Sequence, residues 1–320
     1  MEKKPNLKAM FEEIERERGI KEVDLIRALS DALMSAAKKR FENVDDIDVQ
    51  IGADFSAKIF DKKTGEEITP SDFGRVAAQT AKQVILQRLR EAEKEGTFEE
   101  FSGKIGELIT ASIQQREPAG YIVSVGRSEM FVPLYETIPG ENLRPHDKVR
   151  FLVLEAKRTS KGPTVVITRS HPDFIKKLFE HEIPEISQGV IEIKDIARDP
   201  GRRSKVVMIS NDINVGVVGT CVGPMGSRIQ NITKEVGMER IDIVEWSNDP
   251  KVFITRALSP AKGMKVEIHP EEKRAKVTMP QKDLSLAIGK EGQNVRLASK
   301  ITGYTIDILP EEREQSAQNN

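Results

Sequence analysis

The last third of the chain contains one unit twice, and this duplication constrains the fold more than any other feature. The stretch "CVGPMGSRIQNITKEVGMERIDIV", which begins at Cys221, is followed later by "AIGKEGQNVRLASKITGYTIDIL". Gly223 and Gly226 of the first copy match Gly289 and Gly292 of the second, 66 positions further on. Self-similarity at a fixed spacing indicates one structural unit that is built more than once.

Each copy also opens with two strand-like stretches. These are "IEIKDIARDPGRRSKVVM" (Ile191–Met208) and "VEIHPEEKRAKVTM" (Val266–Met279), each with two apolar patterns around a charged turn. Helical periodicity flanks both Gly-x-x-Gly motifs, and the strand-like "IDIV" or "IDIL" follows. The predicted unit is therefore strand, strand, helix, Gly-x-x-Gly, helix, strand. The bare motif also occurs at 103–106 and 216–219, but without this repeated context.

A helix that stops at Gly-x-x-Gly and restarts at once exposes a particular chemical group. The first N–H groups of the second helix lack intrahelical partners and carry a partial positive charge, so a helix start attracts anions. Glycines remove the side chains that would hold a ligand away, and they permit tight backbone dihedrals. A sugar-phosphate backbone can lie across such a corner. The alternative, a tight corner without a ligand, is weakened by the duplication.

The residues in and after the two corners are the candidate nucleic-acid contacts. They are Gly223, Pro224, Met225, Gly226, Ser227 and Arg228 in the first copy, and Gly289, Lys290, Glu291, Gly292, Gln293, Asn294 and Arg296 in the second. Lys290 adds charge at the contact. Arg296, one turn along the helix, can reach a neighbouring phosphate or base, and Arg228 follows the first corner. Ser227 and Gln293 sit where they can cap the second helix.

The repeated unit resembles the KH domain in its prokaryotic arrangement. In that family the Gly-x-x-Gly loop clamps about four nucleotides of a single strand, and bases lie in an apolar groove beside it. By this resemblance a set of apolar residues is either groove or core, and the sequence leaves the division open. The set is Ile229, Ile232, Ile288, Val295 and the strands "IDIV" and "IDIL". Two features argue against a phosphate contact: Glu291 is a carboxylate in the second loop, and Pro224-Met225 gives the first loop no cation.

Residues 103–170 carry five short β patterns separated by breaks rich in Gly, Pro and Asn. Such a series predicts a small five-stranded barrel, and the phrases "EMFVPLYETIPGE" and "RPHDKVRFLVLE" resemble an OB fold of the S1 type. These barrels bind single strands through exposed aromatic and cationic side chains, for which Tyr121, Arg127 and Phe131 are the candidates. A core position for Phe131 is the favoured alternative, in which case the barrel contributes mainly charge.

A helix is predicted directly after the barrel. The stretch "HPDFIKKLFEHEIPEI" (His171–Ile186) places Phe174, Leu178 and Phe179 on one helical face, and Pro184 ends it. We expect this helix to pack the barrel against the first repeated unit.

The first hundred residues form a separate, helical and mixed region. Amphipathic patterns predict helices over residues 7–20, 21–41 and 72–96, and residues 47–69 predict a hairpin that turns at Thr64-Gly65. Residues 1–100 hold 18 Lys/Arg and 22 Asp/Glu, whereas residues 101–310 hold 31 and 26. An acidic region suits docking on a protein better than docking on a nucleic acid. A stabilising cap without a partner is the alternative.

The totals exclude several classes of protein. A net charge of −1 rules out a positive electrostatic potential over the whole molecule, so nucleic-acid contacts must come from local patches of positive charge. The single cysteine, Cys221, excludes an internal disulfide and a cysteine-clustered metal site, and it indicates a reducing compartment. No apolar run approaches the ~20 residues of a membrane span, and the N-terminus has no apolar signal core. We therefore expect a cytoplasmic protein.

The order of the predicted domains carries a second, wider resemblance. An acidic N-terminal domain (1–102), an S1-type barrel (103–170), two tandem KH domains (171–247 and 248–310) and a tail (311–320) resemble the NusA family of bacterial transcription factors. The most specific stretches are "HPDFIKKLFEHEIPEI", "CVGPMGSRIQNI", "IDIVEWSNDP" and "AIGKEGQNVRLASKITGYTIDI".

This resemblance implies a multidomain α+β protein with defined partners. Its N-terminal domain would dock on RNA polymerase near the RNA exit channel. The barrel and KH surfaces would hold single-stranded nascent RNA and so alter pausing, termination and antitermination. Other elongation or antitermination factors are implied as further partners, and the chain is expected to be a monomer without a membrane contact.

Two other functions compete with this one. Phosphorolytic ribonucleases also carry KH and S1-type modules, but in the reverse order and beside large catalytic domains, for which this chain has no room. The histidines (His146, His171, His181 and His269) are scattered, so we expect no enzymatic activity, no metal and no cofactor. A ribosome-associated or RNA-chaperone protein would use the same modules, and the partner of the first hundred residues distinguishes it.

Overall fold

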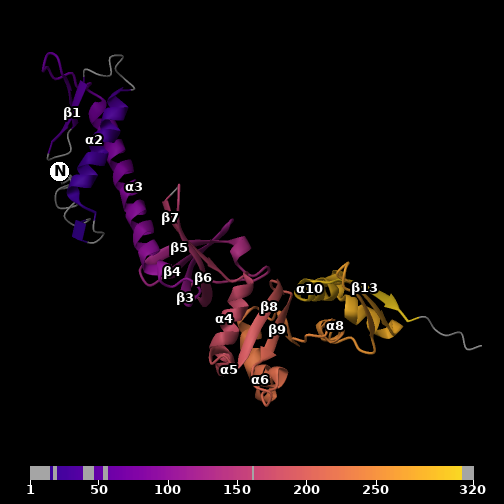
Figure 1. The fold of residues 1–320 in the computed structure, drawn as a ribbon. Coiled ribbons are helices and arrows are strands. Elements are labelled where there is room, and N and C mark those ends of the chain that lie inside the picture. The colour runs from indigo at the N-terminus through magenta and orange to yellow at the C-terminus, as the bar shows by residue number, and fades with distance from the viewer. Residues whose placement is uncertain (1–14, 17–19, 39–46, 53–56, 161, 312–320) are drawn as a thin grey trace, which may run out of the picture. The chain divides into compact units, whose positions relative to one another are not determined.

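The computed structural model of the chain describes residues 15–16, 20–38, 47–52, 57–160 and 162–311 (Figure 1). The chain divides into two compact units. The first consists of residues 1–103 with 156–164, and the second of residues 104–155 with 165–320. Within the described residues, no helix is both long and apolar enough to span a membrane.

Two helices that pack against each other dominate the first unit, α2 (Glu22–Lys38) and α3 (Phe73–Ser102) (Figure 1). Every fourth residue of α2 is buried, as expected for one face of a helix. These residues are Leu25, Leu29, Leu33 and Ala37. The predictions over 21–41 and 72–96 are thereby confirmed, although α3 runs further than expected. The helix predicted over 7–20 lies almost wholly outside the described residues.

The turn predicted for the hairpin of the first unit is present, but the chain also reverses once earlier, which was not predicted. Strand β1 (Ile47–Ile51) pairs antiparallel with β2 (Ala57–Asp61), so the chain reverses between them. The turn at Thr64-Gly65 exists, but it follows β2. The Asp61 carboxylate accepts the N–H of Thr64, and the Asp61 C=O accepts that of Gly65, which has a φ of 70°. This local turn chemistry is typical of Asp and Gly. After the turn the chain runs back along β2, where the N–H of Asp61 donates to the C=O of Glu66 and the N–H of Ile68 donates to the C=O of Ile59.

A barrel-like sheet of five strands comes next, in the order β5-β4-β3-β6-β7; it belongs to the second unit except for residues 156–164, at the end of β6 and the start of β7. The strands are β3 (Leu108–Glu117), β4 (Gly120–Val125), β5 (Ser128–Pro133), β6 (Lys148–Thr159) and β7 (Gly162–Thr168). β3 pairs antiparallel with both β4 and β6, and it carries an irregularity in register between Ile113 and Gln115. The five predicted strands and the OB-type arrangement are confirmed.

Both repeated units have the predicted order of elements. The first contains β8 (Ile191–Asp199), β9 (Arg203–Ser210), α6 (Val217–Val222), α7 (Ser227–Glu235) and β10 (Arg240–Glu245). The second contains β11 (Lys265–His269), β12 (Arg274–Met279), α9 (Leu284–Ile288), α10 (Gln293–Thr302) and β13 (Thr305–Pro310). In each sheet the second strand is central, antiparallel to the first and parallel to the last. We call these the first and second KH regions.

A helix precedes the sheet in both KH regions, and the second of these helices was not predicted. It is α8 (Pro250–Ala257), which Asp249 caps by accepting the N–H of Lys251. An Asp cap followed by Pro at the first helical position is a recognised start signal. The sequence therefore held evidence for α8 that the repeat comparison passed over.

The corresponding helix of the first KH region joins it to the barrel. The stretch predicted as one helix forms two, α4 (Pro172–Glu182) and α5 (Pro184–Ser187), because Pro184 ends one and starts the next. The predicted apolar face, Phe174, Leu178 and Phe179, is buried. It shares one hydrophobic core with Leu152 of β6 and Met208 of β9. The barrel and the first KH region are thus packed through α4, as expected.

Arg169 adds buried polar contacts to this junction. Its side chain is 2% exposed and donates to the Glu141 carboxylate (2.5 Å) and to the C=O of Arg150 (2.5 Å). At the end of α7 it also donates to the carboxylate and the C=O of Glu235, at 3.1 and 2.7 Å. One side chain therefore holds a barrel loop, strand β6 and a KH helix together.

The two KH regions share a core as well. Val207 of β9, Ala197 of β8 and Val244 of β10 pack with Phe253 of α8 and Leu297 of α10. The other face of β9 packs on the helices of its own KH region. The central strand β9 is therefore buried on both faces, which explains the unbroken apolar stretch from Val206 to Ile209 in its second half.

Lys205 is a charged residue within this double-sided strand. Its side chain is 0% exposed and donates to the Asp242 carboxylate at 2.9 Å, beside Arg203, which lies 2.6 Å from the same carboxylate. Burial removes the water that would solvate the ammonium group, and this lowers the pKa of Lys205 to about 8, although Asp242 opposes the effect.

The first prediction concerns the buried arginine of the barrel junction. Arg169→Met leaves Glu141 and Glu235 without their partner, and breaking a buried pair from one side costs about 3–5 kcal/mol. Arg274→Met is the matched control, because Arg274 and Asp307 are each about half exposed and such pairs contribute about 0–1 kcal/mol. Urea unfolding followed by the single tryptophan measures both losses. Equal losses in the two variants would contradict the assignment.

The second prediction concerns pH. Between pH 8 and 10.5 the folded protein has released the Lys205 proton while the unfolded chain still binds it, so the free energy of unfolding gains a contribution as pH rises. Lys205→Met removes this contribution, and Arg203 still neutralises Asp242. The difference in unfolding free energy, wild type minus variant, should therefore grow across this window. Urea titrations at a series of pH values test it, and a constant difference would count against a lowered pKa.

Candidate nucleic-acid interface

The two Gly-x-x-Gly corners have the same backbone shape. The first glycines, Gly223 and Gly289, have φ/ψ of 74°/175° and 75°/171°. The last glycines, Gly226 and Gly292, have 76°/15° and 70°/13°. Side chains rarely tolerate positive φ, so glycine is required at these points. Helices α7 and α10 start directly after the corners, which places their positive ends there.

The side chains inside the corners extend into solvent. Met225 is 98% exposed, and Pro224, Lys290 and Glu291 are exposed as well. Met225 and Glu291 have φ of 53° and 54°, in the left-handed region that non-glycine residues seldom occupy. Strain of this kind is concentrated at functional positions in proteins.

Arg228 supports the first corner from within the first KH region. A Cβ on Gly223 would come within 2.8 Å of the Arg228 side chain, so glycine lets the arginine stem lie against the corner. The guanidinium donates to the C=O of Thr220 at 2.9 Å and to the Glu185 carboxylate at 3.0 Å. The backbone N–H of Glu185, and then Arg228, lower the pKa of that carboxyl. A phosphate at Arg228 would have to compete with Glu185.

Asn294 occupies the equivalent place beneath the second corner, so its side chain is not available to a nucleic acid. It is 0% exposed. Its Nδ2 donates to the C=O groups of Leu286 and Ala287, at 3.0 and 3.1 Å. These carbonyls lie in α9, a helix of five residues, near the end where intrahelical partners are missing. The buried Asn294 side chain therefore caps the C-terminal end of α9.

The predicted capping by Ser227 and Gln293 is wrong. Both are the first residues of their helices, and the cap positions are taken by Gly226 and Gly292. Gln293 instead donates its Nε2 to a residue of the first KH region, the Asp199 carboxylate, at 2.7 Å.

Two further residues of the second corner contact the first KH region. Arg296 lies 3.1 Å from the Asp199 carboxylate, and Glu291 lies 3.1 Å from Arg202. These side chains remain exposed to water, apart from the half-buried Asp199. The second corner is thus linked to the turn between β8 and β9 but remains open.

The apolar residues beside the corners divide between core and surface. Ile232 is core, with 2% exposure, and Ile229 and Val295 are half-buried against the two shared cores. Ile288 is 39% exposed and directly precedes the second corner. Within the set only Leu309, at 41%, is more exposed, and it lies on β13, so Ile288 is the most accessible of the residues that flank a corner.

In the barrel, the burial of the two aromatic candidates is the reverse of what we expected. Tyr121 is 1% exposed in the barrel core, so the prediction that it presents a stacking surface is wrong. Phe131 is 45% exposed, which contradicts its core alternative, and Arg127 is exposed. Tyr135 is 77% exposed and was not a candidate. It follows the strand pattern "EMFVP". Because it lies beyond the strand, the alternation of buried and exposed positions does not predict whether its side chain faces the core or the solvent.

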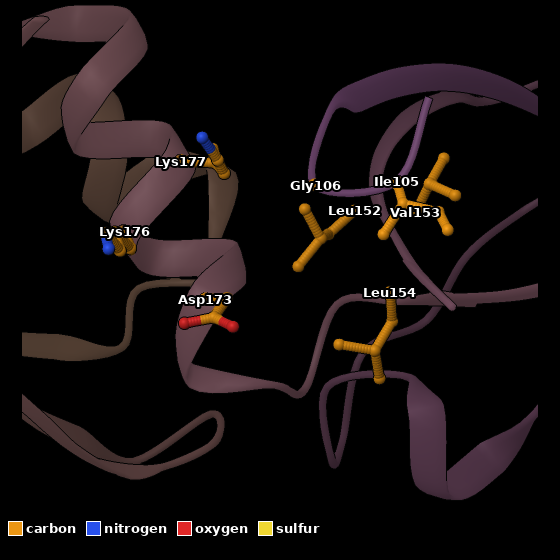
Figure 2. A pocket seen from close by; sticks show the side chains of 8 residues that line it. All are labelled: Ile105, Gly106, Leu152, Val153, Leu154, Asp173, Lys176 and Lys177. Atoms are coloured by element: carbon orange, nitrogen blue, oxygen red, sulfur yellow. The ribbon is translucent and has the colours of Figure 1, made fainter. Parts of the chain in front are cut away.

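A groove lies where the barrel meets α4, as Figure 2 shows. Its volume is about 200 Å³, and it combines an apolar side of Leu152, Val153 and Leu154 with polar residues of α4. Typical small-molecule sites occupy about 300–1,000 Å³, so this groove is small for a substrate pocket. Across the part of the chain that the structure describes, no group of His, Cys, Asp and Glu could hold a metal ion. Cys221 is buried, and burial raises its pKa to about 11.

The third prediction tests why the corners need glycine. A Cβ at Gly289 would lie 2.8 Å from the backbone N of Asn294, whereas a Cβ at Gly292 meets nothing within 4 Å. Gly292 is in the left-handed helical region, where alanine costs about 1–2 kcal/mol. Gly289, with a ψ of 171°, is in a region that only glycine commonly occupies, where alanine costs about 1–3 kcal/mol, and Gly289→Ala also adds a backbone clash. Thermal unfolding should therefore show the larger loss for Gly289→Ala. A larger loss for Gly292→Ala would contradict this geometry.

Comparisons with known proteins agree with this architecture. Three family models match: "NusA N-terminal domain" over residues 6–65 and 56–95, "NusA-like first KH domain" over 169–246, and "NusA-like second KH domain" over 250–316.

Full-length relatives are similar along most of the chain. The transcription termination/antitermination protein NusA of Bacillus subtilis is 40% identical over 93% of this chain and 89% of its own length. Those of Mycobacterium bovis and Thermus thermophilus are 38% and 40% identical, over 94% and 88% of this chain and 92% and 74% of theirs. The chain therefore belongs to the NusA family.

Proposed function

We propose that this chain is an RNA-binding transcription factor that holds single-stranded nascent RNA and thereby modulates pausing, termination and antitermination. The relatives carry the name transcription termination/antitermination protein, and two KH regions supply the RNA-binding modules. The observation that carries the proposal is the pair of solvent-open corners whose glycine dihedrals agree within a few degrees, each at the positive end of a helix. On this proposal the chain acts by binding in the cytoplasm and catalyses no reaction.

RNA contacts on this proposal differ between the modules. In the KH regions the phosphates lie across Gly223–Gly226 and Gly289–Gly292, with Lys290 and Arg296 as cations. In the barrel, Arg127 and Phe131 remain the candidate contacts, because both side chains are exposed. Holding one RNA at several sites raises overall affinity by effective concentration.

The protein partner proposed for residues 1–102 is RNA polymerase near its RNA exit channel. The match of this region to the NusA N-terminal domain and its excess of acidic residues support a protein-docking role. Other elongation or antitermination factors are further proposed partners of a monomeric chain. Binding to ribosomal subunits in place of polymerase would instead favour an RNA-chaperone role.

The fourth prediction tests the corners directly. Replacing Pro224-Met225 and Lys290-Glu291 by Asp-Asp places carboxylates against phosphate, and RNA affinity should fall at least about tenfold, because like charges repel strongly at contact. The matched control is Asn-Asn at the same positions, which keeps size and tolerates positive φ. The affinities of both variants are measured by fluorescence anisotropy with a labelled, unstructured RNA. A length of about 12 nucleotides allows about four for each module. Unchanged affinity in a folded Asp-Asp variant would refute the proposal.

Two further measurements complete this test. The wild-type slope of log affinity against log salt should lie at about −2 to −5, at about −0.7 for each phosphate contact in a single strand. With purified RNA polymerase, the wild type should change pausing or termination, and the Asp-Asp variant should lose most of that effect. A flat salt dependence would show that cations take no part in binding.

A further inference from the structure

The turn between β8 and β9, residues 199–202, contacts the second corner at three points. Asp199 accepts hydrogen bonds from Gln293 at 2.7 Å and from Arg296 at 3.1 Å. Arg202 lies 3.1 Å from the Glu291 carboxylate. The turn belongs to the first KH region, while its three partners belong to the corner and first helical turn of the second. We call it the bridging turn.

The bridging turn is held firmly on its own side. The N–H of Gly201 donates to the Glu239 carboxylate at 2.8 Å, and Glu239 is completely buried in a pair with Arg198 at 2.9 Å. Gly201 also touches the barrel, since a Cβ there would come within 2.9 Å of the C=O of Pro139. The turn is thus fixed between the barrel and the first KH region, and it presents Arg202 to the second corner at a defined place.

The second corner contains a charge that opposes its proposed ligand. Glu291 lies between the two glycines, where a phosphate would approach, and a carboxylate there repels the phosphate. The equivalent residue of the first corner, Met225, carries no charge and contacts no cation of this kind. Only the second corner needs its carboxylate neutralised, and the neighbouring KH region brings an arginine to it.

We propose that the second RNA site is composite: Arg202 of the first KH region neutralises Glu291 and so makes the second corner competent for phosphate. This inference rests on the proposed function, and it assigns to Arg202 a positioning and charge-balancing role. Asp199 supports it by holding the start of α10 against the same turn. The site is therefore complete only while the two KH regions stay docked through their shared core.

A double-mutant cycle tests the proposal on the full chain. Arg202→Gln, Glu291→Gln and the double variant are compared with wild type by anisotropy, using the same unstructured RNA. Arg202→Gln should weaken binding by up to about fivefold, the upper end of the range expected for one exposed charge pair. In the Glu291→Gln background the same change should have little effect, because no carboxylate is left to neutralise. This coupling should shrink at high salt, since both side chains are about two-thirds exposed.

The charge swap gives an independent readout. Arg202→Glu should weaken binding more than Arg202→Gln. Adding Glu291→Arg should raise affinity by a larger factor in the Arg202→Glu background than in wild type, which a purely structural role of Arg202, or a direct gain from the new cation alone, would not explain. Lys194→Glu is the control for net charge, because Lys194 lies on β8 and pairs with Glu192 away from the corner. It should leave affinity nearly unchanged. Circular dichroism verifies that each variant folds.

The outcomes separate this inference from the function on which it rests. An equal loss from Arg202→Gln in both backgrounds would show that Arg202 binds phosphate by itself, and no loss in either background would show that it takes no part. Either result overturns the composite site while RNA binding by the corners stands. A chain that bound no single-stranded RNA at all would overturn the proposed function and this inference with it.

Discussion

The sheet of the first KH region must be covered on both faces, and much of the second unit depends on this constraint. One face of β9 is covered by the helices of its own region, and the other by α8 and α10 of the second KH region. Removing both faces from water is strongly favourable at about 25 cal/mol per Å² of apolar surface. The two KH regions are therefore packed as one body around a shared strand, and each corner lies at a fixed place on that body.

The two corners share a backbone but differ in what supports them. Beneath the first corner lies Arg228, whose guanidinium donates hydrogen bonds to Glu185 and to the C=O of Thr220 in its own region. Beneath the second lies Asn294, which is buried and leaves the cationic contribution to side chains at the surface. Those side chains, Arg296 among them, are oriented by the first KH region. Duplication thus preserved the backbone geometry of the corner while the surrounding side chains diverged.

Local pattern was sufficient for the order of elements and for the shape of the corners. Glycine is needed wherever the backbone takes positive φ, so Gly223, Gly226, Gly289 and Gly292 identified the corners without any tertiary information. Periodicity placed the strands and helices of the barrel and of both KH regions. It found the turn at Thr64-Gly65 but missed the earlier reversal between β1 and β2, and it missed α8, whose cap was visible in the sequence.

The sequence by itself determined the repeat, the element order, the corners and the family, because these depend on residues close together along the chain. Only the tertiary structure decided the direction of the polar and aromatic side chains. Tyr121 is buried and Phe131 exposed, although both lie on strands with apolar alternation. The partnership of Arg202 with Glu291 joins residues 89 positions apart. Burial and ion pairing depend on which surfaces meet, and packing between distant segments sets that.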